Sequence, residues 1–240
     1  MSQSASTFWA IVPAAGIGTR MGTAKPKQYL TLGDRSVLEH TLTRLALHPL
    51  ISGIVVATAA EDPYWRELRR LPEKPVIQVT GGAERCHSVL QCLRYLRNSQ
   101  QAQTWVLVHD AARPCVRLED IDKLINACSR HEVGGLLGVP VHDTMKRCDE
   151  TGVVIDTVDR HQLWHAQTPQ MFRLQLLLDA LERALAGNRL VTDEASAVEA
   201  LGLTPLMVAA SADNIKITRP EDLALAQFYL QQQQEMSSCA

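Results

Sequence analysis

Short apolar runs alternate along most of the chain with stretches in which apolar residues recur at helical spacing. Runs of strand length predict β-strands at residues 8–12, 51–58, 75–80, 105–108 and 134–139. Helical spacing predicts helices at residues 37–47, 63–70, 119–131 and, after Gly82, as far as Leu96. Such alternation is typical of a mostly parallel sheet with helices on both faces. We therefore predict an α/β, Rossmann-like fold.

The alternation stops between residues 140 and 164. Two strand-like pieces, near Met145 and at residues 153–158, flank the turn-rich segment 149–152. This pattern predicts a β-hairpin arm that projects from the sheet. The arm has too few apolar residues to fold by itself, so we expect it to pack against a second subunit.

The chain after the arm predicts two helices, at residues 174–186 and 193–201, and two short strands, at 206–209 and 214–218. A last helix is predicted from the Thr-x-x-Glu capping pattern at 218–221, and it runs into a polar tail from residue 231. Because no linker or repeat is visible, we interpret residues 1–240 as one domain that includes the arm at 140–164.

Composition excludes several classes of protein. A net charge of -2, with 21% charged and 46% hydrophobic residues, gives no sign of a nucleic-acid or membrane partner. No apolar run approaches the roughly 20 residues that cross a bilayer, and the first residues lack a signal-peptide pattern, so we expect a cytoplasmic protein. The six cysteines lack a C-x-x-C pair and predict buried or incidental thiols, with neither a zinc site nor a disulfide framework.

The segment after the first predicted strand carries the strongest chemical pattern. Residues 13–28 hold Gly16 and Gly18 together with three cations, Arg20, Lys25 and Lys27, and residues 16–29 contain no acid. Such a loop can bring backbone N–H groups and positive charge against a polyphosphate. The glycine spacing fits neither a Rossmann fingerprint nor a Walker A loop. A solvated glycine-rich turn would have no need of the cations.

This loop, Pro-Ala-Ala-Gly-x-Gly-x-Arg-Met followed by Pro-Lys-Gln, resembles the start of the sugar-phosphate nucleotidyltransferases. Later blocks are similar to the 2-C-methyl-D-erythritol 4-phosphate cytidylyltransferase family, and they extend along almost the whole chain: Gly81-Gly82 with Glu84-Arg85 and Ser88, His109 to Pro114, Asp143 to Lys146, Val158 to Arg160, Trp164 to Gln170, Thr192 to Glu194, and Asn214 to Thr218. Seven blocks in the same order argue against a chance resemblance.

The resemblance implies an enzyme of the non-mevalonate isoprenoid pathway that uses Mg²⁺. A phosphate oxygen of methylerythritol phosphate would attack the α-phosphorus of CTP and displace pyrophosphate, without a covalent protein intermediate. The implied catalytic cations are Arg20, Lys27, Arg160 and Lys216. The implied nucleotide-binding residues are Pro13, Ala14, Ala15, Gly16, Gly18, Lys27, Gly82, Ser88, Asp110 and Ala111.

The second substrate is implied to contact residues that are far apart in the chain: Asp110, Arg113, Thr144, Arg160, Thr168, Thr192 and Lys216. Thr144 and Arg160 fall in the predicted arm. Arms of this family interlock in a homodimer, so each site is implied to take these two residues from the neighbouring chain. Mg²⁺ is expected to be held mainly by the CTP phosphates, with Asp110 as a candidate protein ligand.

Several alternatives stay open at single residues. Asp110 also suits a turn or helix cap, Thr192 also suits the N-cap of the helix from Asp193, and Lys216 also suits a solvated strand position. His161 and His165 are four residues apart but lack a third ligand at a suitable spacing, so we reject a metal site there. Relatives can carry Asp where this chain has Ala83. The change is harmless if cytosine is recognised through backbone contacts, and it makes CTP selectivity less secure if the carboxylate takes part.

Two other functions also remain open. A cytidylyltransferase for another polyol phosphate, such as ribitol 5-phosphate, shares most of these blocks. A nucleotide-binding module without catalysis would keep the glycines, but it would have no reason to keep Arg20, Lys27, Arg160 and Lys216 together.

Overall fold

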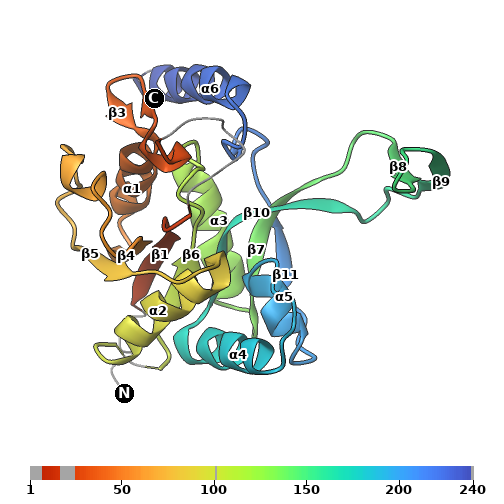
Figure 1. Cartoon of the computed structure of the whole chain (residues 1–240), viewed down its shortest axis with the longest axis horizontal. Helices are drawn as coiled ribbons and strands as arrows, with labels where there is room; N and C mark the ends of the chain where they lie inside the picture. The colour runs from red at the N-terminus through yellow and green to blue at the C-terminus, as the bar shows by residue number, and fades with distance from the viewer. Residues whose placement is uncertain (1–6, 17–24, 101, 239–240) are drawn as a thin grey trace.

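A seven-stranded sheet forms the centre of the computed structural model, which describes residues 7–16, 25–100 and 102–238 (Figure 1). The strand order is β11-β7-β10-β6-β1-β4-β5. The bounds are β1 Phe8–Pro13, β4 Ile51–Thr58, β5 Val76–Thr80, β6 Trp105–Val108, β7 Gly134–Pro140, β10 Trp164–Arg173 and β11 Leu206–Ala209. Neighbouring strands are parallel except at β10, which is antiparallel to β6 and β7. The mostly parallel sheet is confirmed.

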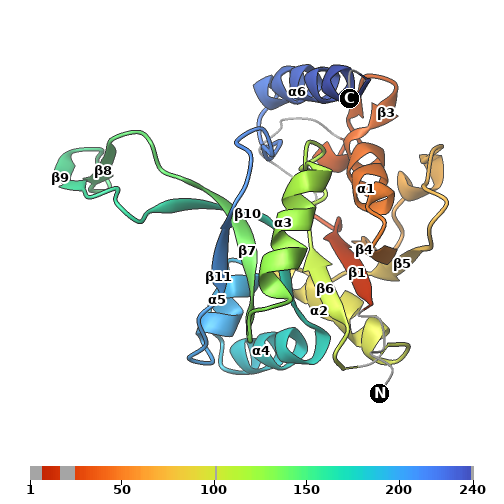
Figure 2. The ribbon, with the colours of Figure 1, turned by 180° about the vertical axis from the view of Figure 1, so that it is seen from behind.

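Helices cover both faces of this sheet, as predicted (Figures 1 and 2). One hydrophobic cluster joins α1 Val37–Leu47 and α3 Leu118–Cys128 to one face. A second cluster joins α2 Arg85–Arg97, α4 Leu174–Ala186 and α5 Glu194–Glu199 to the other. The central strands separate the two clusters because successive side chains of a strand point to opposite faces.

The predicted capping pattern at the start of α1 is present. The Ser36 hydroxyl accepts from the Glu39 N–H at 3.2 Å, and the Ser36 N–H donates to Glu39 Oε2 at 2.7 Å. Such a reciprocal pair satisfies two donors that a helix start would otherwise leave unpaired.

Strand β10 is a central element that the periodicity did not reveal. Its sequence, WHAQTPQMFR, is interrupted by Pro169 and carries polar side chains that are buried, among them Gln167 and Gln170. The pairing with β7 is irregular between Ala166 and Gln170. A strand whose inward residues hydrogen-bond within the protein does not show the apolar period of two.

Two predicted elements in other parts of the chain are wrong. Only the 3₁₀ turn η3, Trp65–Glu67, forms where a helix was expected at 63–70. After this turn the N–H groups of Arg69 and Arg70 donate to Glu39 Oε1 on α1, so they do not form the hydrogen bonds of a continuing helix. The expected strand at 214–218 is irregular chain, in which Ile217 N donates to Ala112 O at 2.8 Å.

The last helix, α6 Glu221–Ser238, is longer than expected, because it includes the glutamines assigned to a polar tail. Gln233 is buried and donates to Cys115 O at 2.9 Å, which ties this part of α6 to the body. At the start of the helix Thr218 donates to Asp222 and not to Glu221. Three shorter elements, η2 Lys27–Tyr29, β2 Thr31–Leu32 and β3 Arg35–Ser36, lead from the first loop into α1.

The predicted hairpin arm is confirmed. Strands β8 Met145–Cys148 and β9 Val154–Val158 pair antiparallel and project away from the body in both ribbon views (Figures 1 and 2). Asp149 closes the turn by accepting from the N–H groups of Thr151 and Val153. Nearly every side chain of the arm is exposed. None of the described helices has an apolar stretch long enough to span a membrane.

Candidate nucleotide and phosphate site

A cavity of about 260 Å³ opens beyond the carboxyl ends of β1, β5 and β6, where a parallel sheet is expected to bind its ligand. It is lined by Pro13, Ala14, Ala15, Gly16, Lys27, Gln28, Gly82, Ala83, Glu84, Arg85, Ser88, Asp110, Ala111, Ala112 and Lys216. Nine of the ten residues expected to bind the nucleotide are therefore brought together, and the tenth, Gly18, lies outside the described residues, as does Arg20.

The first loop is held open by a buried side chain, Gln28. Its amide donates to Ala14 O at 2.7 Å and to Gly16 O at 3.0 Å, while Ala14 N donates to Ala57 O on β4. These bonds occupy two carbonyl oxygens that would otherwise repel a polyphosphate. The Pro-Lys-Gln sequence thus has a structural role that its composition alone did not indicate.

Lys27 connects this loop to the far end of the chain. Its ammonium donates to Ile217 O at 2.8 Å, next to Lys216, which also lines the cavity. Two cations separated by nearly 190 positions thus meet at one cavity, which is the arrangement expected for neutralising phosphate charge.

Gly82 and Ser88 form the side of the cavity that follows β5. The Ser88 hydroxyl accepts from Gly82 N at 3.1 Å and donates to Glu84 O at 3.2 Å, so it fixes the backbone of this turn. A Cβ atom on Gly82 would lie 2.4 Å from His87 Cβ. Glycine is therefore needed here for close packing, which leaves backbone groups at the cavity wall.

Asp110 lies at the centre of the charged groups. Its Oδ1 accepts from Arg85 Nε at 2.9 Å, and its Oδ2 lies 2.9 Å from Lys216 Nζ and 3.5 Å from Arg113 Nε. Burial by itself would raise the pKa of this carboxyl, but the three cations outweigh it and hold the pKa far below its usual range. Asp110 is thus ionised throughout the physiological range.

Arg85 is in turn held by a buried carboxylate, Glu194, through bonds of 2.6 and 3.0 Å. Burial lowers the pKa of Arg85, and the charges of Glu194 and Asp110 reverse that shift and raise it. Sequence reasoning assigned a role to neither Arg85 nor Glu194, although both lie in recognised blocks. Their spacing of 109 positions gives no sign that they meet.

Thr168 holds the backbone of Asp110 in place. Its hydroxyl accepts from Asp110 N and lies 3.0 Å from His109 Nδ1. Since His109 Nε2 lies 3.0 Å from the carbonyl oxygen of Arg113, which can only accept, we assign the proton to Nε2, so that Thr168 donates to Nδ1. This use of the hydroxyl makes Thr168 a positioning residue in this arrangement.

The buried His109 predicts a pH dependence of stability. Burial lowers the pKa of His109 from 6.5 to about 4, so the unfolded chain binds its proton more readily than the folded one. The free energy of unfolding therefore keeps its full value above pH 6.5, and it falls by about 3 kcal/mol as the pH drops towards 4. Urea unfolding between these pH values should show a shallower pH slope in His109→Gln than in the wild type. Equal slopes would contradict the assignment.

The remaining expected substrate residues lie elsewhere. Arg113 is partly buried beside Asp110, and its guanidinium also donates to Asn214 O at 2.6 Å. Thr192 is exposed, and Asp193 is the N-cap of α5, so the alternative that Thr192 caps this helix is wrong. Thr144 and Arg160 are exposed on the arm.

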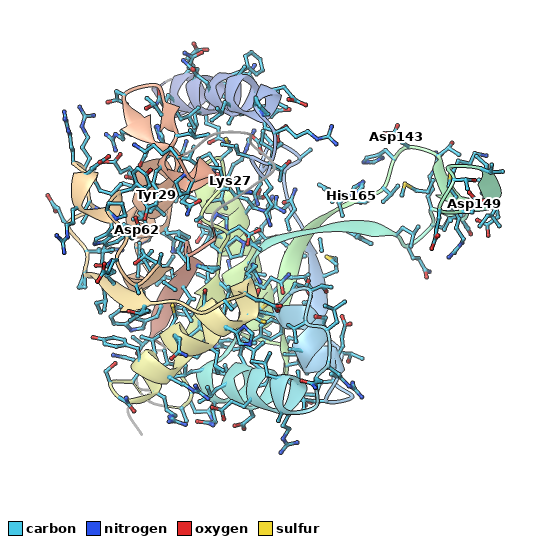
Figure 3. The ribbon with its side chains drawn as sticks, in the orientation of Figure 1. Lys27, Tyr29, Asp62, Asp143, Asp149 and His165 are labelled. Carbon is cyan, nitrogen blue, oxygen red and sulfur yellow. The ribbon has the colours of Figure 1, made fainter. Side chains whose placement is uncertain are left out.

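The arm holds its residues away from the cavity. Figure 3 shows Asp143 and Asp149 far out on it, His165 near its base, and Lys27 in the body. His165 is on β10 and His161 in the turn before it, so these two do not share a helical face. One chain alone does not bring Thr144 and Arg160 to the Lys27 side of the molecule.

The donor set for Mg²⁺ is limited at this cavity. Both Asp110 oxygens are already engaged by Arg85 and Lys216, and a divalent cation there would have to displace a positive side chain. Glu84 is the other carboxylate among the described lining residues, and it is exposed. As arranged, Asp110 does not fit a Mg²⁺ ligand, which favours a cation held by the substrate phosphates.

Known proteins are similar to this chain in sequence and in fold. The family described as 2-C-methyl-D-erythritol 4-phosphate cytidylyltransferase matches residues 8–232. A protein of that name from Vibrio vulnificus is 52% identical over 235 residues, which cover 98% of this chain and 99% of that protein. One from Vibrio parahaemolyticus is 55% identical and covers 96% and 98%. The crystal structure of the Francisella tularensis cytidylyltransferase of this family matches with a TM-score of 0.82 at 36% identity, covering 93% and 100%.

Proposed function

Because the chain belongs to the 2-C-methyl-D-erythritol 4-phosphate cytidylyltransferase family, we propose that its cavity binds CTP and that the cations around Asp110 receive the second substrate. The reaction joins CTP and 2-C-methyl-D-erythritol 4-phosphate to give 4-diphosphocytidyl-2-C-methyl-D-erythritol and pyrophosphate, a step of isoprenoid synthesis. The observation that supports the residue assignment is the meeting of Lys27 and Lys216 at one cavity beyond the carboxyl ends of the strands.

In this proposal catalysis depends on alignment and charge. A phosphate monoester is already anionic at neutral pH, so the attacking oxygen needs no general base. Lys27, together with Arg20, would stabilise the α-phosphate and the pyrophosphate that leaves. Mg²⁺ bound to the triphosphate would neutralise further phosphate charge. The backbone at Gly82, held by Ser88, would face the cytosine.

Asp110 and Lys216 would hold the second substrate. The ionised Asp110 carboxylate is suited to accept a hydrogen bond from a polyol hydroxyl, while Lys216 at 2.9 Å from it can pair with the phosphate of the same molecule. The bidentate Glu194 fixes Arg85, and Arg85 fixes Asp110, so this geometry exists before the substrate arrives.

We further propose a cytoplasmic homodimer in which the arm of each chain completes the site of the other. The arm exposes Val153, Val154 and Ile155, each more than half accessible, which a partner would cover. It also carries Thr144 and Arg160 away from the cavity of its own chain. Each cavity would therefore receive these two residues from the arm of the neighbouring chain.

The proposed reaction is tested by measuring pyrophosphate release with Mg²⁺. CTP, UTP and ATP should each be paired with methylerythritol phosphate and with ribitol 5-phosphate. Of these six pairs, we expect turnover only with CTP and methylerythritol phosphate. Faster turnover with ribitol 5-phosphate would support the alternative polyol specificity, and nucleotide binding without any pyrophosphate release would support a non-catalytic module.

The shared site has its own prediction. Arg160→Ala should raise KM for methylerythritol phosphate strongly while CTP affinity, measured by calorimetry, stays nearly constant. Arg147→Ala is the matched control, because Arg147 is an exposed arginine of the same arm that pairs with Asp156.

Mixing Arg160→Ala with Lys27→Ala should then restore activity. A hybrid dimer contains one site with both intact residues, if the arm crosses to the neighbour. No recovery in a mixture shown by mass spectrometry to have exchanged subunits would mean that each site is built within one chain.

A further inference from the structure

Three side chains at the start of α2 bring different metal-binding groups together. Glu84, Cys86 and His87 each place one ligand atom so that all three atoms lie within 4.8 Å of one another. No other group of three such donors occurs in the described part of the chain. The set combines a thiol, an imidazole and a carboxylate, which is the mixture that Zn²⁺ accepts and Mg²⁺ does not.

The distances already approach those of a coordinated ion. Cys86 Sγ lies 3.7 Å from Glu84 Oε2. Tetrahedral Zn²⁺ with ordinary Zn–S and Zn–O lengths holds its sulfur and oxygen about 3.5 Å apart. The thiol and the carboxylate therefore need only a small movement to share an ion. The ligand nitrogen of His87 lies within 4.8 Å of both and must move closer to them.

The local fold keeps these groups in place. Glu84 is the N-cap of α2, and Cys86 and His87 belong to its first turn, so helical geometry fixes their backbone. His87 packs against Gly82, and its buried Nδ1 has no hydrogen-bond partner among the residues that the structure describes. Arg85, which lies between the ligands in sequence, is held elsewhere by Glu194 and Asp110.

We propose that Glu84, Cys86 and His87 form a binding site for a thiophilic divalent cation of the Zn²⁺ class, separate from the Mg²⁺ that accompanies the nucleotide. Glu84 and Ala83 line the cavity, so an ion here sits beside the wall assigned to cytosine. Occupancy should then raise KM for CTP. This second effect rests on the proposed function, whereas binding of the metal does not.

Binding is tested with Co²⁺ added to the intact protein, because a cobalt–thiolate bond gives a near-ultraviolet charge-transfer absorption that oxygen and nitrogen ligands lack. We expect this absorption in the wild type and in Cys148→Ser, which removes the exposed thiol of the arm. It should be absent in Cys86→Ser and displaced by Zn²⁺. Absence in the wild type, or persistence in Cys86→Ser, would overturn the site.

The effect on activity is measured separately, with Zn²⁺ titrated against excess Mg²⁺. We expect KM for CTP to rise severalfold in the wild type and in Cys148→Ser, and to stay constant in Cys86→Ser, whose thiol does not line the cavity. Equal inhibition of all three proteins would overturn the coupling. If the protein shows the cobalt absorption but no cytidylyltransferase activity, the metal site is supported and the proposed function is contradicted.

Discussion

Lys27→Ala should lower kcat about a thousandfold, the loss seen when one cation is removed from phosphoryl-transfer sites. Lys27 reaches the cavity from the first loop and is held there by Ile217 O at 2.8 Å. Its ammonium is placed to meet negative charge that grows on the leaving phosphate, so the loss should appear in kcat more than in KM. Steady-state pyrophosphate release provides the measurement.

The matched control for this variant is Lys123→Ala. Lys123 lies on α3, away from the cavity, and pairs with the buried Asp120, so its loss should lower stability without changing the cavity. It should keep nearly full activity. Circular dichroism and thermal unfolding should show both variants folded. A Lys27→Ala enzyme that turns over normally would remove Lys27 from the mechanism.

The hydrophobic pattern correctly predicted the helices and strands that bury mainly apolar side chains. The helix expected at 174–186 forms with those bounds as α4, because its apolar stripe packs on the sheet through Leu177, Leu178 and Leu181. The strand expected at 51–58 forms as β4. In both cases the local period and the tertiary environment require the same side chains inside.

Polar burial explains what the pattern missed. Strand β10 turns Gln167 and Gln170 inwards, where Gln170 accepts from Ala195 N and donates to Asp193. The Arg85–Glu194 pair joins α2 to α5 in the same way. Such contacts follow from which strands and helices become neighbours, and neither residue spacing nor composition records that.

The family resemblance identified residues that spacing could not bring together. It marked Asp110 and Lys216, and the structure places them 2.9 Å apart. It also marked Thr168, whose hydroxyl in this structure holds Asp110 N and His109. A resemblance thus selects the residues of a site, and only the geometry separates those that face the cavity from those that support it.

Asp110→Asn should reduce both activity and stability. The amide keeps the shape of the carboxyl but removes the negative charge that faces Arg85, Lys216 and Arg113, and breaking a buried pair costs roughly 3 kcal/mol. Lys216 would lose the partner that holds it at the cavity. We expect kcat/KM for methylerythritol phosphate to fall about a hundredfold, on the scale of lost charge-assisted hydrogen bonds.

Asp120→Asn separates the two effects. Asp120 is also a buried aspartate, paired with Lys123 and accepting from Ser211 N, but it does not line the cavity. It should lower the urea midpoint while leaving kcat/KM of the folded enzyme unchanged. If Asp110→Asn matched this behaviour, Asp110 would be a structural anion alone. If Asp110→Asn instead loses turnover while still folded, its carboxylate acts at the site, on the substrate or through Lys216, since both variants remove one negative charge from a buried aspartate.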